Sequence, residues 1–391
     1  MGGLPDFISE GAGPFQFRVM RLLSILLGLF FVLSINAQIK NGLYRVKNYK
    51  TERYVYVLDN TGSINYSTTS ADMGAMELWK DLDRCIDNPA SIIQVVNVGN
   101  NDYDLQSQGT GVHDIISHYV TIYPYGDGTY QLYASNGSLG KYLSDEETTN
   151  VPDGQLGTTN KGEYRKWLPI PMDTESNYFG LRPSLQCGSK FYQTFYADFR
   201  IKMLGEGMKA YTVKEIYKHI VAIEEITDEV IPANTPVLIE CSSNQAGDNK
   251  LELFVRDKSQ LGRTNLLKGV YFNNPYRPKS KDARTAYNGN TMRVLGLTEN
   301  GEIGFVMSSD PYIAANSAYL QVPEGTASEL VFMSPEELEK YKLESGIIGV
   351  SGVSVAKAVY TLSGLKVAEK VEDLHTLPAG IYIVNGKKVI R

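Results

Sequence analysis

The stretch that decides the fold is Tyr119–Glu146, "YVTIYPYGDGTYQLYASNGSLGKYLSDE". Tyrosine and aliphatic residues alternate along it, and polar turns such as "GDG" interrupt the alternation. A period of two, bounded by Gly, Asn and Asp, is typical of short strands joined by tight turns. The stretch therefore predicts a β-rich region, and the same pattern of alternating strands and polar turns can be sought on either side of it.

Two further segments, Gly42–Gly62 and Ser91–Gly111, look like variations on the same unit. Together the three segments resemble the lobes of a ricin-type β-trefoil, a fold of secreted sugar-binding modules. The Gln-x-Trp motif frequent in that family is missing at both tryptophans, Trp79 and Trp167. We expect residues 38–200 to form one β-rich, trefoil-like domain, with an irregular β-sandwich as the alternative.

A second block, residues 201–333, contains an internal repeat that predicts a β-sandwich domain. "IPANTPVL" at Ile231–Leu238 recurs as "IAANSAYL" at Ile313–Leu320, and Asn followed by Thr or Ser favours a turn that leads into a strand. With the preceding stretch "FYADFRIKMLGEGMKAYTV", the repeat is similar to an uncharacterised exported protein family of Bacteroidetes-type bacteria. The resemblance implies an architecture and a location, but no activity.

The C-terminal part is expected to be a helical linker, residues 334–346, followed by a small β-sandwich domain, residues 347–391. Ser334 and Glu337 have the spacing of a capping box, and Gly346 would end the helix. "VYTLSG", "LPAGIY" and "NGKK" resemble the C-terminal sorting tail of the type IX secretion pathway. The resemblance implies that secretion machinery is a partner; the alternative is a purely structural β-domain.

The N-terminal residues 1–37 are predicted to be a secretory signal peptide. Arg18 and Arg21 precede the apolar run Leu22–Ser34, and Ala37 is a suitable residue before cleavage. The run is shorter than the ~20 apolar residues that a spanning helix requires, although a membrane anchor is the alternative. We therefore expect a secreted or cell-surface protein with no transmembrane helix in its mature form.

Composition and motifs restrict the chemistry. A formal net charge of -6 argues against nucleic acid as a partner, because nucleic-acid binding requires a basic surface. The 3 cysteines are too few for a disulfide framework and lack the spacing of a metal site. The sequence has neither HExxH nor G-x-S-x-G, so no catalytic residue, metal or cofactor is predicted.

The candidate binding residues are tyrosines on one face of two predicted strands. In Tyr119–Tyr125, the residues Tyr119, Tyr123 and Tyr125 lie opposite Val120 and Ile122. Tyr54 and Tyr56 alternate with valines in the same way. The tyrosines form either a second packing layer or an exposed face that suits a glycan or another host or cell-surface ligand.

Two classes of function remain. The first is a secreted or cell-surface, non-catalytic binding or adhesion protein that binds glycans. The alternative is an exported hydrolase acting on glycan or peptide, whose paired carboxylates are far apart in the chain.

Overall fold

The structure is a computed structural model that describes residues 38–57, 76–79, 82–107, 120–136, 139–145, 156–157, 162–274, 284–344, 358–362, 364–369, 371–384 and 387–391. The fold is mainly β, which confirms the predicted class. The chain divides into two compact units, one ending at Val331 and the other running from Phe332 to Arg391. Each unit is described separately below.

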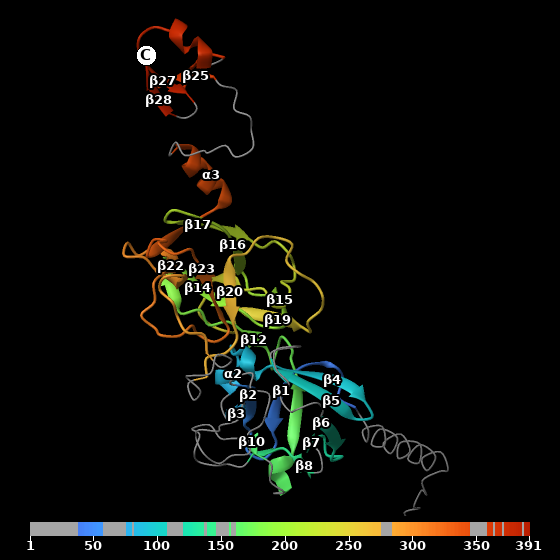
Figure 1. Ribbon diagram of the computed structural model, residues 1–391. Helices are drawn as coiled ribbons and strands as arrows, with labels where there is room; N and C mark the ends of the chain where they lie inside the picture. Colours follow the sequence, from blue (N-terminus) through green and yellow to red (C-terminus); the bar gives the residue numbers. More distant parts are fainter. Residues whose placement is uncertain are drawn as a thin grey trace, which may run out of the picture. The chain divides into compact units, whose positions relative to one another are not determined.

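Six of the described strands close into an antiparallel barrel (Figure 1). In the order of the ring they are β1 (Gly42–Asn48), β4 (Ile93–Gly99), β5 (Asp102–Ser107), β6 (Val120–Pro124), β7 (Tyr130–Asn136) and β11 (Trp167–Pro171). The ring closes where β11 pairs with β1, from Tyr44 opposite Pro171 to Asn48 opposite Trp167. We call residues 38–171 the barrel region.

Additional short elements are inserted between the strands of the ring. They are β2 (Tyr54–Val57), β3 (Met76–Trp79), α2 (Leu82–Cys85), η2 (Pro89–Ser91), β8 (Leu139–Tyr142), β9 (Ser144–Asp145), β10 (Leu156–Gly157) and η3 (Gly162–Arg165). A sandwich would require two separate sheets packed face to face, whereas one sheet closes on itself here. The expected β-rich region is thus present, and its strands form a barrel-like ring.

The barrel core follows the alternation seen in the sequence. Ile122 and Leu132 are buried on neighbouring strands β6 and β7, together with Val46, Ile93 and Trp167. Trp167 is fully buried, and its Nε1–H donates to the carbonyl of Leu143 at 3.0 Å. Because alternate residues point to opposite faces, burying Ile122 directs Tyr123 outward.

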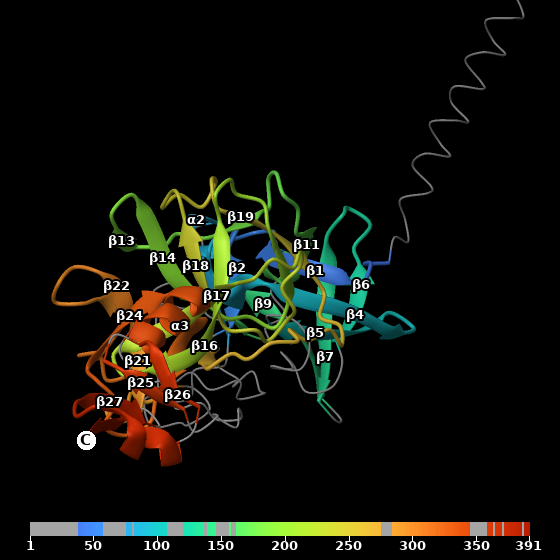
Figure 2. The same cartoon turned by 90° about the horizontal axis from the view of Figure 1, so that it is seen from above.

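The second β region, residues 172–331, contains two sheets (Figures 1 and 2). The larger has ten strands, in the order β13 (Leu185–Cys187), β14 (Lys190–Phe195), β18 (Val237–Cys241), β16 (Lys209–Tyr217), β17 (Ile220–Glu225), β24 (Glu329–Met333), β22 (Ile303–Val306), β21 (Met292–Leu297), β23 (Ser317–Gln321) and β20 (Leu267–Val270). The smaller has three strands, in the order β12 (Phe179–Gly180), β19 (Lys250–Phe254) and β15 (Arg200–Met203).

These sheets use residues on both sides of the expected domain boundary at residue 200. β14 pairs with β18 over Phe191–Phe195, and β12 pairs with β19, so strands before residue 200 belong to the second β region. Leu43 and Ile92 of the barrel region share a core cluster with Phe179 and Phe195. The two regions are therefore packed together inside one compact unit.

Arg45 joins the two regions from inside the protein. It lies on β1, is fully buried, and donates to the carbonyls of Cys85 and Tyr178 at 2.9 Å and to Asn177 Oδ1 at 2.8 Å. Burial lowers its pKa to about 10, so the guanidinium remains charged at neutral pH. Asn177 and Tyr178 directly precede β12, so this one side chain links β1 to the start of the second β region.

The internal repeat has a structural counterpart. Asn234 and Asn316, which occupy the same position in the two copies, have φ values of 60° and 50°, in the left-handed region that asparagine tolerates. The strands that follow are β18 and β23, and each buries the final leucine of its copy, Leu238 or Leu320. The predicted turn into a strand is thus present in both copies.

The second unit contains a helix and a four-stranded sheet. In α3 (Pro335–Glu344) the Ser334 N–H donates to Glu337 Oε2 at 2.8 Å and the Glu337 N–H donates to Ser334 Oγ at 3.2 Å, as the capping box predicts. The sheet order is β26 (Lys366–Ala368), β25 (Val359–Thr361), β27 (Ile381–Val384) and β28 (Lys387–Ile390), and η4 (Val371–Thr376) lies between β26 and β27 in the chain.

Candidate functional site

Tyr123 of β6 and Tyr125, which directly follows that strand, lie on the outer face of the barrel. Tyr123 is 43% exposed and Tyr125 is 36% exposed, while Ile122, the residue before Tyr123, is buried. On the neighbouring strand, Gln131 is paired with Tyr123, and its side-chain amide donates to the Tyr125 hydroxyl. The outer face of β6 and β7 therefore presents ring surface and hydroxyl groups together.

A row of aromatic rings continues from Tyr123 across the strands. Tyr123 meets Tyr133 of β7 edge to face at a centroid distance of 6.3 Å, and Tyr133 meets Tyr142 of β8 at 5.1 Å. The guanidinium of Arg165, at the end of η3, lies over the Tyr142 ring at 4.8 Å. We call these four residues the tyrosine ladder.

A second aromatic group surrounds Lys166. Its ammonium lies 5.1 Å from the Tyr125 ring centroid and 5.5 Å from that of Tyr49, which is 49% exposed. The same Nζ is 2.8 Å from Asp127 Oδ2 and 3.1 Å from Glu163 Oε1. These carboxylates, Asp127 first, raise the pKa of Lys166, and the Lys166 hydrogen bond holds the pKa of Asp127 low.

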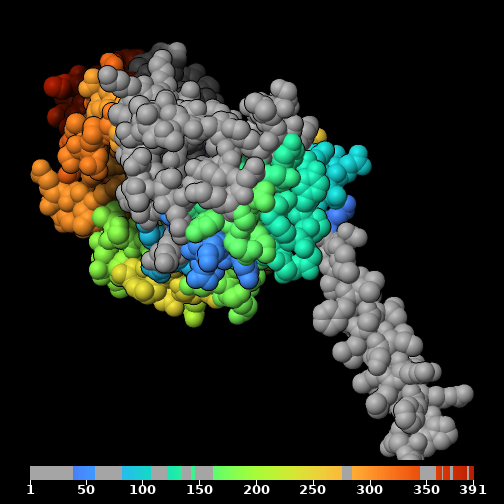
Figure 3. All heavy atoms as spheres, turned by 90° about the horizontal axis from the view of Figure 1, so that it is seen from below, coloured from blue at the N-terminus to red at the C-terminus, as the bar shows by residue number. Residues whose placement is uncertain are grey.

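We call the ladder, together with Tyr49, Tyr125 and Lys166, the tyrosine face. Three segments of the chain meet to form it. The turn after β1 supplies Tyr49. Strands β6 to β8, together with the residue that follows β6, supply the other tyrosines, and η3 with the residue after it supplies the cations. In Figure 3, blue, teal and green atoms of these parts of the chain adjoin one another. Backbone bonds fix the arrangement, since the Tyr49 N–H donates to the Lys166 carbonyl at 2.8 Å.

The other predicted tyrosines lie elsewhere. Tyr119 is outside the described residues. Tyr54 is only 7% exposed and clusters with Cys85, and the half-buried Tyr56 packs against the same cluster. The reason is that α2 contacts β2 on the side opposite the barrel core, so both faces of this strand are covered. Tyr54 and Tyr56 therefore do not extend the exposed face.

Sequence reasoning missed most of the residues that surround Tyr123 and Tyr125. Tyr133 could have been found, because it alternates with the buried Leu132 as Tyr123 does with Ile122. Tyr49, Arg165 and Lys166 had no comparable signal, since they lie in turns whose position depends on the closure of the barrel.

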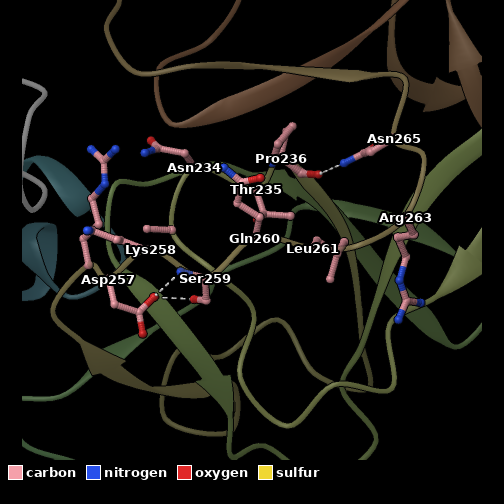
Figure 4. A pocket seen from close by; sticks show the side chains of 12 residues that line it. Asn234, Thr235, Pro236, Asp257, Lys258, Ser259, Gln260, Leu261, Arg263 and Asn265 are labelled. Carbon is pink, nitrogen blue, oxygen red and sulfur yellow. Dashed lines mark hydrogen bonds between the residues drawn. The ribbon is translucent and has the colours of Figure 1, made fainter.

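A separate groove lies in the second β region (Figure 4). It has a volume of about 650 Å³ and is lined by the repeat turn, residues 233–236, and by residues of the loop 256–265. Arg256 in its wall contacts the fully buried carboxylate of Asp198 at 3.2 Å. Burial raises the pKa of Asp198 to about 6.

The acids at this groove are engaged in structural contacts. The side-chain amide of Asn234 donates to Asp198, and the Asn234 oxygen accepts from the Tyr271 hydroxyl. Asp257 forms an ion pair with Arg200 at 2.7 Å and accepts from the Ser259 N–H. A hydrolytic pair requires two carboxyl groups that reach the substrate. With Asp198 fully buried, these two residues do not supply such a pair.

The described residues contain no group of three or more His, Cys, Asp or Glu side chains that could hold a metal ion. Cys85, Cys187 and Cys241 are all free thiols. Within the described part of the chain, no helix has the length and apolarity required to span a membrane. No known protein family matches the chain, and no curated protein matches it in sequence.

Proposed function

We propose that this protein is a secreted or cell-surface binding protein without catalytic activity, and that its tyrosine face binds glycans. The observation that supports the proposal most directly is the exposure of Tyr123 and Tyr125 beside Tyr49 on one outer face of the barrel. Single exposed apolar residues are ordinary, but a contiguous aromatic patch is uncommon and is typical of interaction sites.

The chemistry of the tyrosine face suits a sugar. A sugar ring has an apolar face and a rim of hydroxyl groups, and a tyrosine ring offers a flat apolar surface with a hydroxyl at its edge. Asp127 and Glu163, each about half exposed, add carboxylate acceptors beside the rings, and Lys166 adds a donor. Stacking and hydrogen bonding are thus available within one small area.

The test compares binding with stability in the same variants. Tyr123→Ala and Tyr125→Ala are screened against a glycan array, and their thermal unfolding is measured. We expect lost or strongly reduced binding with a melting temperature close to that of the wild type. Tyr319→Ala, in the second β region, is the matched control and should retain binding. A melting temperature lowered by several degrees in Tyr123→Ala would instead assign the ring to packing.

We also propose that the N-terminal residues 1–37 direct export and that the C-terminal segment 347–391 is read by secretion machinery. Support comes from the sequence motifs and from the division of the chain near Phe332, which makes the C-terminal segment part of a separate compact unit. Asn385 and Gly386 of the "NGKK" motif lie outside the described residues, whereas β27 and β28 on either side of them are paired.

A further inference from the structure

Arg165 occupies a particular position on the tyrosine face. It ends the tyrosine ladder, with its guanidinium 4.8 Å from the Tyr142 ring centroid, and it is half-buried. An arginine stacked on an aromatic ring is held flat, so its remaining N–H groups point outward in a fixed plane. Such a plane matches the two oxygens of a carboxylate or sulfate group.

Arg165 differs from its neighbour Lys166 in its partners. Lys166 has two carboxylates within 3.1 Å, Asp127 and Glu163. Among the described residues Arg165 has no carboxylate partner, and its buried Nε has no hydrogen-bond acceptor. A buried arginine N–H without an acceptor is costly, because the guanidinium loses hydration and gains nothing in return. A ligand cannot reach the buried Nε, but an anion bound to the terminal N–H groups would compensate the partly buried charge of Arg165.

The charges along the face are arranged asymmetrically. Near Tyr125, two carboxylates face one ammonium, so that end carries a surplus of negative charge and favours neutral hydroxyl groups. Near Tyr142, the stacked guanidinium supplies positive charge. A ligand with an acidic group on one sugar would therefore bind in a single direction along the ladder.

From this geometry we propose that the tyrosine face selects acidic glycans, with the sugar rings along the ladder and the anionic group on Arg165. The inference rests on the proposed glycan binding and adds the class of sugar. Carboxylate and sulfate groups share the chemistry that Arg165 recognises, so both belong among the probes. Neutral sugars would bind through the rings and the hydrogen bonds near Tyr125 without the contact to Arg165, and therefore more weakly.

The experiment compares pairs of polysaccharides that differ in charge. Polygalacturonic acid is tested against its fully methyl-esterified form, and a sulfated polysaccharide against its desulfated form, with the full-length chain as the binding protein. We expect the wild type to bind each acidic member about tenfold or more tightly, the size that a charge-assisted hydrogen bond supports. Added salt should reduce this preference.

Three variants separate the inference from the function on which it rests. Arg165→Gln should abolish the acidic preference by lowering the affinity for each acidic member to that for its uncharged counterpart, and Arg165→Lys should restore only part of the preference. Lys268→Gln, an exposed charge in the second β region, is the charge-matched control and should bind as the wild type does.

Equal affinity of the wild type for the charged and uncharged members would overturn the acidic class and leave the proposed function intact. An acidic preference that persists in full in Arg165→Gln would likewise overturn the assignment of the anionic group to Arg165. If the wild type is folded, as judged by its thermal unfolding, but binds none of the polymers, both proposals are overturned.

Discussion

Replacing Arg45 with methionine should destabilise the larger unit more than any surface arginine change. The methionine keeps the volume of the aliphatic stem but removes every donor. The Cys85 carbonyl retains the Ser91 hydroxyl as a partner, whereas no other donor among the described residues reaches the Tyr178 carbonyl or Asn177 Oδ1. Two buried acceptors left without partners cost about 1–3 kcal/mol each.

The loss is partly offset, because the variant no longer buries a charge. We therefore expect a net loss of about 3 kcal/mol, which in a unit of this size lowers the melting temperature by roughly 6–12 °C. Differential scanning calorimetry measures it. Arg45→Lys should lose nearly as much, since one ammonium cannot reach acceptors on both sides of a guanidinium.

Arg200→Met is the matched control, because its partner Asp257 is 43% exposed and pairs at the surface contribute about 0–1 kcal/mol. If Arg45→Met melts within about 2 °C of this control, estimated from the same scaling, the buried bonds of Arg45 do not hold the two regions together. The reasoning from unsatisfied acceptors would then be refuted.

Four more outcomes are expected. Because burial raises the pKa of Asp198 to about 6, ionising this carboxyl group lowers the free energy of unfolding as pH rises from about 4 to 7. Thermal melts at several pH values should show that Asp198→Asn removes about 3 kcal/mol of this loss. Wild-type and variant stabilities that change in parallel with pH would contradict the prediction. Asn234→Ala should melt lower than Asn234→Gly, by about 1 kcal/mol, because alanine resists a φ of 60°; equal melting would count against strain. Gly269→Ala places a Cβ 2.2 Å from the Tyr196 ring and should cost about 1–3 kcal/mol, whereas a neutral result would mean that the ring moves freely. Deleting Gly346–Arg391 should leave a folded protein that no longer reaches the cell surface on immunoblots of cell fractions; aggregation of the remainder would show that the deleted segment belongs to the core.

The sequence predicted those features that depend on neighbours along the chain. The capping box of Ser334 and Glu337 and the inward direction of Ile122 both follow from local spacing. The two repeat turns were also predictable, since asparagine tolerates the left-handed region.

Features that depend on distant pairing could not be derived in the same way. The expected boundary at residue 200 separates β14 from β18, although the two strands pair. Local sequence patterns do not reveal this pairing, because β18 is some forty residues further along the chain. Tyr54 shows the same limit at the candidate site. Strand alternation correctly predicts that Tyr54 points away from the barrel core. It does not reveal that α2 covers the opposite face of β2.

Ring closure has a consequence for self-association. A strand at the edge of an open sheet presents unpaired backbone groups to other chains, and the six-stranded ring has no such edge. The C-terminal sheet, by contrast, ends at β26 and β28, and each edge carries lysine: Lys366 on one, Lys387 and Lys388 on the other. Edge lysines oppose strand addition by repulsion. Masking those charges should therefore let the C-terminal sheets of separate molecules join edge to edge.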